Sequence, residues 1–260
     1  MKGRVLIIAG SDSGGGAGIQ ADIKTVTMLG GYAATAVTAI TVQNTHGVTG
    51  VVGVDPAVVE AQGIAVLDDI GADAIKTGML GSAEMVDMVA ETLAEHAPGI
   101  PLVVDPVMVA KGGSPLLDEA AVGVLKKKLL PMAALVTPNL PEAEVLTGIY
   151  PASEHRLRNC AMVFKMLGVN HVLFKGGHGD SDVARDVLWS GGTFVPFEAP
   201  RQNTPHTHGT GCTLATAIAC GLAQGRSLLD SVSRAHMFVQ NAIRTAPGLG
   251  HGHGPLNHKA

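Results

Sequence analysis

The chain has 260 residues, of which 46% are hydrophobic and 15% charged, a composition typical of a globular protein rather than a disordered one. Its formal net charge is −4, and its longest basic run is the lysine triplet at residues 126–128, so the charge pattern predicts no nucleic-acid partner. We expect that triplet at a helix end, where cations are favoured. No stretch approaches the roughly 18 apolar residues that a membrane span needs, so we expect no membrane partner.

The cysteines indicate a reducing compartment. Cys160, Cys212 and Cys220 are the three cysteines of the chain, and no Cys-x-x-Cys pair occurs. An odd number without pair spacing argues against both a disulfide framework and a zinc site. The apolar run at residues 5–9 is too short for the core of a signal peptide. We therefore expect a cytoplasmic protein in which Cys160 and Cys220 are small structural residues.

Short apolar runs alternate with longer segments of helical pattern. The predicted strands cover residues 5–9, 36–42, 72–76, 102–104, 135–137 and 171–174. The predicted helices cover residues 17–29, 58–70, 83–96 and 213–223. Residues 183–198 predict a hairpin with a Gly-Gly turn at one sheet edge. This alternation predicts a single α/β domain over residues 1–260, with a mostly parallel central sheet flanked by helices on both faces in three layers.

Polar or glycine-rich sequences follow four of the predicted strands directly. They are Gly10-Ser11-Asp12, Thr77-Gly78-Met79, Asp105-Pro106 and Lys175-Gly176-Gly177. In an open parallel sheet, ligands bind beyond the carboxyl ends of the strands. Their repetition predicts a binding site along one edge of the sheet.

The glycine-rich segment 10–22 follows the first predicted strand and opens a helix. It lacks the P-loop pattern, because no lysine lies between Lys2 and Lys24, and Ile19 breaks the dinucleotide-binding pattern. One interpretation is a tight strand-to-helix turn. The other is close approach of the backbone to a small ligand, helped by Asp12 and Asp22.

Two further strand ends carry side chains suited to a ligand. The amide of Gln43 can both donate and accept a hydrogen bond, so it can recognise the edge of a flat heterocycle, although taken alone the residues there are better explained by an ordinary polar loop. Lys175 could place a point charge on a phosphate, or be a solvated lysine beside a turn.

Asp105 and Glu142 are candidate magnesium ligands. Mg²⁺ takes one or two carboxylates and keeps water and phosphate oxygens in its shell. Glu142 also has a structural explanation, because Asn139 three residues earlier could cap a helix and form a capping box with it. The two explanations are compatible.

Gly209-Thr210-Gly211 precede a long apolar helix that is predicted to be buried. Successive backbone N–H groups at such a helix N-terminus form an anion site. Cys212 follows directly, and a thiol at a helix N-terminus is expected to have a lowered pKa.

These motifs occur together in one order. They are GSD at 10–12, GGAGIQADIKT at 15–25, TVQNT at 41–45, KTGML at 76–80, DPVM at 105–108, TPNLPE at 137–142, KGGH at 175–178 and HGTGCT at 208–213. The series closely resembles the hydroxymethylpyrimidine/phosphomethylpyrimidine kinases of thiamine biosynthesis, members of the ribokinase-like superfamily. The resemblance runs from residue 5 to about residue 258, including a tail similar to that of the family.

The resemblance implies ATP-dependent phosphorylation of 4-amino-5-hydroxymethyl-2-methylpyrimidine and then of its monophosphate, with Mg²⁺, in a homodimer. It implies that the pyrimidine is bound by Gln43, Asp22, Ala17, Gly10, Met79 and Val107. It implies that ATP is contacted by Asn139, Lys175, Thr210 and Thr213, and Mg²⁺ by Asp105 and Glu142. The catalytic set implied is Cys212, Gly209, Gly211 and Lys175.

Cys212 stands where most sugar kinases of this superfamily carry an aspartate as base. Its thiolate could take the hydroxymethyl proton, or the residue could act mainly through its backbone N–H, and the sequence leaves both roles open. Gly14 departs from the family pattern, which has a serine there. The missing hydroxyl puts in doubt any substrate contact assigned to that serine, and the glycine loosens the loop.

The chief alternative is a pyridoxal or pyridoxine kinase of the same superfamily, because pyridoxine is also a flat ring with a hydroxymethyl group. A sugar kinase is disfavoured by the missing Gly-Ala-Gly-Asp pattern. A non-catalytic pyrimidine sensor is disfavoured by the presence of Asp105, Glu142, Lys175 and Cys212. The tail, with His251, His253 and His258, predicts either a mobile lid over the active site or, less readily, adventitious metal binding.

Overall fold

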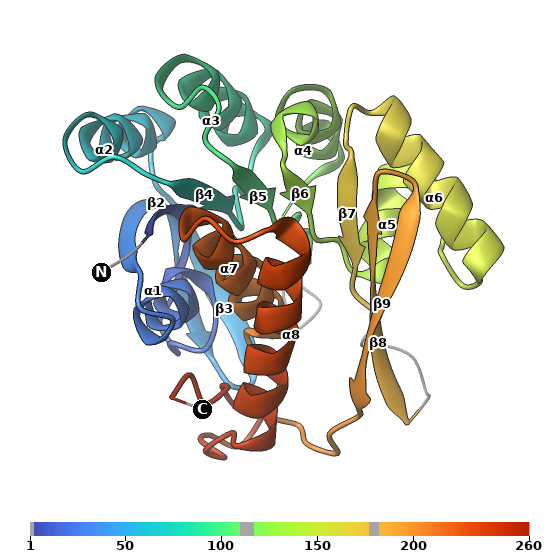
Figure 1. The fold of residues 1–260 in the computed structure, drawn as a ribbon. Helices are drawn as coiled ribbons and strands as arrows, with labels where there is room; N and C mark the ends of the chain where they lie inside the picture. Colours follow the sequence, from blue (N-terminus) through green and yellow to red (C-terminus); the bar gives the residue numbers. More distant parts are fainter. Residues whose placement is uncertain (1–2, 110–116, 177–181, 260) are drawn as a thin grey trace.

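A computed structural model describes residues 3–109, 117–176 and 182–259, and every structural statement below concerns these residues. They form one nine-stranded sheet in the order β3-β2-β1-β4-β5-β6-β7-β8-β9, with helices on both faces (Figure 1). The six strands from β2 to β7 in this order are parallel, and β3, β8 and β9 pair antiparallel at the two ends. The predicted three-layer, mostly parallel architecture is confirmed.

The strands are β1 (Arg4–Asp12), β2 (Tyr32–Asn44), β3 (Gly47–Gly53), β4 (Ala74–Thr77), β5 (Leu102–Val104), β6 (Leu135–Val136), β7 (His171–Phe174), β8 (Val183–Ser190) and β9 (Thr193–Pro200). The helices are α1 (Gly18–Met28), α2 (Pro56–Asp69), α3 (Ala83–His96), α4 (Glu119–Val124), α5 (Leu140–Thr147), α6 (Glu154–Met166), α7 (Thr210–Ala223) and α8 (Leu228–Arg244).

Most predicted elements are present with small shifts of their ends. The helix at 83–96, the strands at 102–104 and 171–174, and the Gly-Gly hairpin at the sheet edge are confirmed. Strand β3 and helices α6 and α8 were not predicted. The segment that forms β3 is rich in glycine, which weakens the strand pattern, and it is ordered by pairing with β2.

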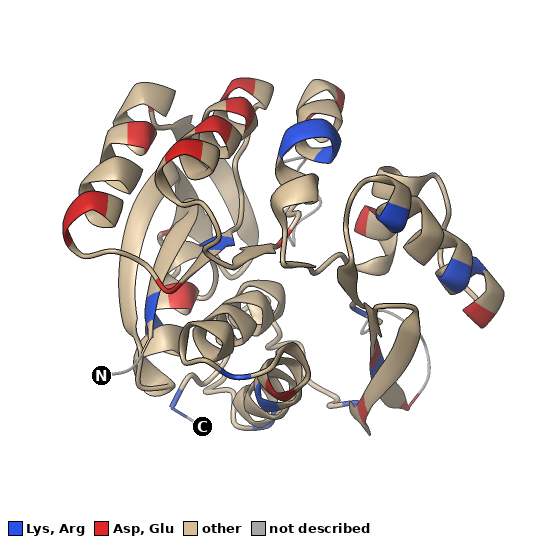
Figure 2. Cartoon of the chain, turned by 45° about the horizontal axis from the view of Figure 1, so that its top comes forward, with Lys and Arg blue, Asp and Glu red and all other residues tan. Residues whose placement is uncertain are grey.

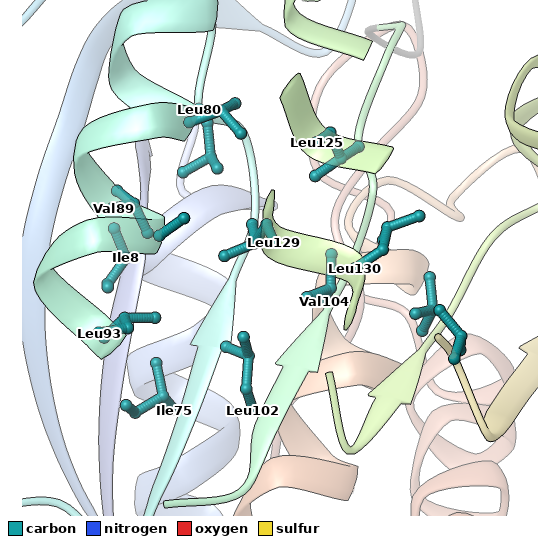
Figure 3. Packing of buried hydrophobic residues seen from close by; sticks show 14 of the residues in the cluster. Ile8, Ile75, Leu80, Val89, Leu93, Leu102, Val104, Leu125, Leu129 and Leu130 are labelled. Carbon is teal, nitrogen blue, oxygen red and sulfur yellow. The ribbon is translucent and has the colours of Figure 1, made fainter. Parts of the chain in front are cut away.

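Strand β1 shows why the sheet is buried on both faces. Leu6 and Ile8 pack into a core cluster with α2 to α6, whereas Val5 and Ile7 pack into a second cluster with α1, α7 and α8. Alternate residues of a strand point to opposite faces, so a continuous apolar run is what a doubly covered strand requires. Figure 3 shows side chains of the first cluster filling the space between the sheet and its helices.

The lysine triplet lies at a helix end, as predicted. Residues 125–129 form a single π-helical turn that continues α4. Lys128 pairs there with Asp87 and with Glu91 of α3, at 3.0 Å from the Glu91 carboxylate. Figure 2 shows this basic turn beside the acidic positions of α3, to which Lys128 links it. Among the described residues, no helix is both long and apolar enough to cross a bilayer.

Candidate active site

A cavity of about 490 Å³ lies beyond the carboxyl ends of the parallel strands. Of the predicted site residues, those that line it are Gly10, Ala17, Gln43, Met79, Asp105, Val107, Asn139, Glu142, Lys175, Gly209, Thr210, Gly211 and Cys212. Asp22 and Thr213 do not line it and are fully buried. Gly177 and His178, which end the Lys175 motif, lie outside the described residues. The motifs therefore converge on one site, as the strand ends predicted.

Asp12 organises the glycine-rich loop between β1 and α1. Its carboxylate accepts hydrogen bonds from the N–H groups of Gly14 (2.8 Å), Gly16 (3.0 Å) and Ala17 (2.8 Å), and Oδ2 lies 2.9 Å from His208 Nε2. Burial by itself would raise the pKa of Asp12, but His208 and the loop N–H groups outweigh it and lower the pKa. The loop is thus wrapped around a carboxylate whose ionised form is stabilised. Gly14 contributes its backbone, so the missing serine hydroxyl leaves this bond intact.

Gln43 is held in place at the end of β2 from two directions. Its backbone N and O both bond to Ser13 Oγ, at 2.8 and 2.7 Å. Its side-chain amide lies between Thr41 Oγ1, at 3.1 Å, and His208 Nε2, at 3.2 Å. A side chain fixed in this way presents a defined donor and acceptor to the cavity, as recognition of a heterocycle needs.

Asp22 forms a buried ion pair. Its Oδ2 lies 2.8 Å from Lys76 Nζ, its Oδ1 accepts from Thr216 Oγ1 at 2.6 Å, and neither charged side chain has exposed surface. Burial alone would lower the pKa of Lys76, but the Asp22 carboxylate raises it above its ordinary value. Asp22 therefore supports Lys76, which lines the cavity, and does not itself reach the space where a substrate would lie.

Lys175 lies beside both predicted magnesium ligands. Its Nζ lies 2.8 Å from Asp105 Oδ1 and 3.8 Å from Glu142 Oε2. Thr137 Oγ1 donates to the same Asp105 oxygen at 3.1 Å. Burial raises the pKa of Glu142, with Lys175 opposing it and Asp105 adding to it. The cluster joins the ends of β5, β6 and β7, which are far apart in sequence.

Glu142 also completes the predicted capping box. Asn139 Oδ1 accepts from the Glu142 N–H, and the Glu142 carboxylate accepts from the Asn139 N–H, each at 2.8 Å. The capping box fixes the direction of the Glu142 side chain at the first turn of α5. The structural interpretation of Glu142 is confirmed, and its role as a magnesium ligand stays a prediction for a carboxylate that lines the cavity.

Gly209 begins α7 in a conformation that only glycine adopts readily. Its φ is +86°, and a Cβ built on it would lie 1.7 Å from the carbonyl oxygen of Gly16 in the glycine-rich loop. Gly211 is close to Lys175, since a Cβ there would lie 3.3 Å from Lys175 Nζ. The first N–H groups of α7 therefore stand beside the Lys175 cluster. An anion site at this helix N-terminus stays a prediction, and the nearby lysine is compatible with it.

Cys212 differs from the prediction in its acidity. Burial raises the pKa of its thiol to about 11, although Lys76 acts in the opposite direction and Asp22 and Asp105 add to the rise. The expected lowering of the thiol pKa at a helix N-terminus is thus wrong for this chain in its ligand-free form, because burial outweighs the opposing charge of Lys76. Cys160 and Cys220 are fully buried, as predicted.

Three cavity residues were missed as candidates for function. Asp12 was noted only as a possible helper in the first loop, and Lys76 and His208 were quoted within motifs without a role. A buried lysine inside an apolar strand is a signal that sequence can offer, because such a charge needs a partner. The pairing of Asp12 with His208, 196 positions apart, had no local signal.

The C-terminal tail lies differently from the lid that was expected. None of residues 250–258 lines the cavity. Instead they bond to the turn between β2 and β3 and to the loop before α7. The described residues contain no group of three or more His, Cys, Asp or Glu side chains placed to hold a metal ion, so metal binding by the tail is without support.

Comparison with known proteins identifies the family. The family model described as phosphomethylpyrimidine kinase matches residues 12–257. This chain belongs to that family. It is 53% identical to the thiamine biosynthesis bifunctional protein ThiED of Geobacter sulfurreducens over 99% of its own length, but it spans only 52% of that protein. It is 46% identical to the hydroxymethylpyrimidine/phosphomethylpyrimidine kinase of Haemophilus influenzae, covering 99% of this chain and 97% of the relative.

A solved structure of the wider superfamily is also similar. The pyridoxal kinase of Staphylococcus aureus, in complex with AMP-PCP and pyridoxal, matches with a TM-score of 0.91 and 36% identity over 100% of this chain and 94% of that one. Its identity is lower than that of the pyrimidine kinases. The predicted ribokinase-like fold, the class of phosphotransferase and the hydroxymethylpyrimidine/phosphomethylpyrimidine kinase family of thiamine biosynthesis are confirmed.

Proposed function

We propose that this phosphomethylpyrimidine kinase family member transfers the γ-phosphoryl group of ATP to 4-amino-5-hydroxymethyl-2-methylpyrimidine and then to its monophosphate. One observation carries the proposal. A single cavity holds a fixed amide, Gln43, together with a cationic and carboxylate cluster around Lys175 and the N-terminus of α7. A heterocycle bound at the amide and an ATP at the cluster would have their reacting groups in the same space.

In phosphoryl transfer, the protein contributes mainly by positioning the reactants and stabilising the developing charge. Lys175 would contact the phosphates of ATP, assisted by Asn139 and Thr210. The N–H groups of Gly209, Gly211 and Cys212 would stabilise the charge that develops on the transferred group, because they point from a helix N-terminus and need no reorganisation. The pyrimidine would lie among Gln43 and the walls formed by Gly10, Ala17, Met79 and Val107.

Cys212 would take the proton of the hydroxymethyl group. In that step the substrate oxygen bonds to the γ-phosphorus, the bond from this phosphorus to the β-phosphate oxygen breaks, ADP leaves, and the proton passes to Cys212 Sγ. The thiol is protonated in the resting site, so the reactive thiolate is a minor form at neutral pH. The positive charge of nearby Lys76 partly offsets the effect of burial on the thiol pKa, and so increases the fraction of thiolate.

The donors around Lys175 fit Mg²⁺. Asp105, just beyond β5, and Glu142, in the first turn of α5, offer two carboxylates, the number that Mg²⁺ takes when phosphate oxygens and water complete its shell. With ATP bound, the metal would neutralise charge on the phosphates. Asp105 and Glu142 would hold it there, and Lys175 would move from the carboxylates to the phosphates.

An ATP-consumption assay with three acceptors tests the substrate. We expect kcat/KM to be higher for hydroxymethylpyrimidine and its monophosphate than for pyridoxal. A higher value for pyridoxal would reverse the assignment in favour of a pyridoxal kinase. Ligand-induced thermal stabilisation without any ADP would instead support a non-catalytic pyrimidine-binding protein.

We propose a homodimer, in a cytoplasmic and single-domain protein. The exposed face of the β2–β3 hairpin supports it. Ile40 of β2 and Val52 of β3 are cross-strand partners, with Val42 on the same face, and their exposed fractions are 55%, 64% and 59%. A contiguous exposed apolar face of this kind marks association. We expect Val52→Lys to halve the mass measured by light scattering, whereas an unchanged mass would remove this face from the interface.

A further inference from the structure

The tail segment, residues 250–258, forms hydrogen bonds to two residues close to Gln43, namely Thr45 and His208. The Gly252 N–H donates to Thr45 Oγ1 at 3.2 Å, and the His253 N–H donates to the Thr45 carbonyl at 2.7 Å. Thr45 is only two residues beyond Gln43 in the turn that joins β2 to β3. The segment therefore fixes the backbone on the far side of the proposed pyrimidine-recognising amide.

The same segment holds the residue that touches the Gln43 side chain. The His208 N–H donates to the Gly254 carbonyl at 3.1 Å, and His208 pairs with Pro255 in a short parallel bridge. His208 Nε2 in turn lies 3.2 Å from the Gln43 amide and 2.9 Å from Asp12. Two separate routes thus lead from the tail to Gln43, one through the turn and one through His208.

The segment is anchored firmly enough to transmit position. Leu256 and His258 are buried, with exposed fractions of 4% and 6%. His258 Nε2 lies 3.0 Å from Thr213 Oγ1 in the first turns of α7, and the Asn257 N–H donates to the carbonyl of Ala242 in α8 at 3.0 Å. The tail is therefore tied to the helix whose N-terminus forms the proposed anion site, as well as to the hairpin that carries Gln43.

The tail is packed so closely against the turn at Thr45 that Gly252 has no room for a side chain. A Cβ built on Gly252 would lie 2.2 Å from the Thr45 carbonyl oxygen, where ordinary contact begins at 3.4 Å. The φ of Gly252 lies outside the left-handed region, so a larger residue there is opposed by contact alone. An added methyl group must push the tail and the Thr45 turn apart by about 1 Å, a displacement that matters for reactant positioning.

We infer that the tail segment 250–258 is a positioning element for pyrimidine recognition, which sets Gln43 relative to the N-terminus of α7 by holding Thr45 and His208. None of its residues lines the cavity, so it acts through these two residues rather than on the substrate. The inference rests on the proposed role of Gln43 in binding the pyrimidine. It extends the active site to a segment about 40 residues beyond the last catalytic motif.

The test compares Gly252→Ala with Gly53→Ala in the full-length chain. Gly53 ends strand β3 of the same hairpin, has no atom within 4 Å of a built Cβ, and has no left-handed φ, so it is a matched control. We expect Gly252→Ala to raise KM for hydroxymethylpyrimidine at least tenfold with KM for ATP unchanged, and Gly53→Ala to change neither. General destabilisation would lower the active fraction and would not raise one KM selectively.

Two further variants keep the outcome decisive. Thr45→Val removes the acceptor of the Gly252 N–H at nearly constant volume, and it should raise the same KM severalfold even if Gly252→Ala fails to fold. Gln43→Ala sets the reference. If Gln43→Ala raises KM for the pyrimidine while folded Gly252→Ala and Thr45→Val leave it unchanged, the positioning role is overturned. If Gln43→Ala itself has no effect, the proposed role of Gln43 fails and the inference falls with it.

Discussion

The acidity of Cys212 leads to a measurable pH dependence of turnover. With a thiol pKa of about 11, the thiolate is about one molecule in 10⁴ at pH 7 and about one in 10² at pH 9. If the thiol keeps this pKa when both substrates are bound and its thiolate takes the substrate proton, kcat should rise about 100-fold between these two pH values, close to tenfold per unit. Cys212→Ala keeps the backbone N–H but loses the base, so we expect at least a 10²-fold fall in kcat and no such slope.

Steady-state kcat at saturating substrates, measured from pH 7 to pH 9.5, tests the first part. Iodoacetamide alkylation of the ligand-free chain tests the second, because its rate follows the thiolate and should keep rising past pH 9. Cys160 and Cys220 have no exposed surface, and Cys212→Ala measures their background. An alkylation plateau below pH 8 would refute the effect of burial. A flat kcat together with near-normal turnover of Cys212→Ala would leave only the backbone role.

Three further predictions follow from buried charges. Lys76→Met leaves the Asp22 carboxylate buried without its partner, and it should lower the free energy of unfolding in urea by about 3–5 kcal/mol. Adding Asp22→Asn should recover most of this loss. Equal stability of the single and double variants would contradict the prediction. Burial and Lys24 lower the pKa of His258 to about 4, so its stabilising effect is complete above pH 6.5 and declines as pH falls towards 4. Wild type should lose about 2 kcal/mol more than His258→Gln between pH 7 and pH 5 in thermal unfolding, and parallel curves would argue against it. Glu142→Gln keeps the capping box but removes a charge, so melting should be unchanged while the Mg²⁺ concentration for half-maximal activity rises about tenfold; an unchanged requirement would exclude Glu142 as a ligand.

Patterns within single elements made much of the fold predictable. Val5 to Ala9 is a continuous apolar run because both faces of β1 are covered, and alternation of such runs with helices is enough to indicate a parallel sheet. The capping box of Asn139 and Glu142 was readable because its two partners are three residues apart. Strand β3 was not, because its glycines give no strand pattern until β2 supplies the partner.

The site was predictable as a set of residues but not as a set of contacts. Ordered motifs identified the family, and strand ends placed most of their residues at one edge. Asp22 shows the limit of that reasoning. Its motif predicted a substrate contact, whereas the fold turns its carboxylate inward to Lys76 and Thr216. A charge buried in the core must find a partner, and that partner was 54 positions away.

By itself the sequence determined the class of fold, the family, and which residues have the chemistry for phosphoryl transfer, because periodicity, caps and motifs are short-range properties of the chain. Only the tertiary structure decided the acidity of Cys212, the partner of Asp22 and the place of the tail. Each of these depends on how much solvent is excluded and on which charges approach from distant elements. Cys212 has the helix N-terminus that predicts a reactive thiolate, and the surrounding protein reverses its expected pKa shift.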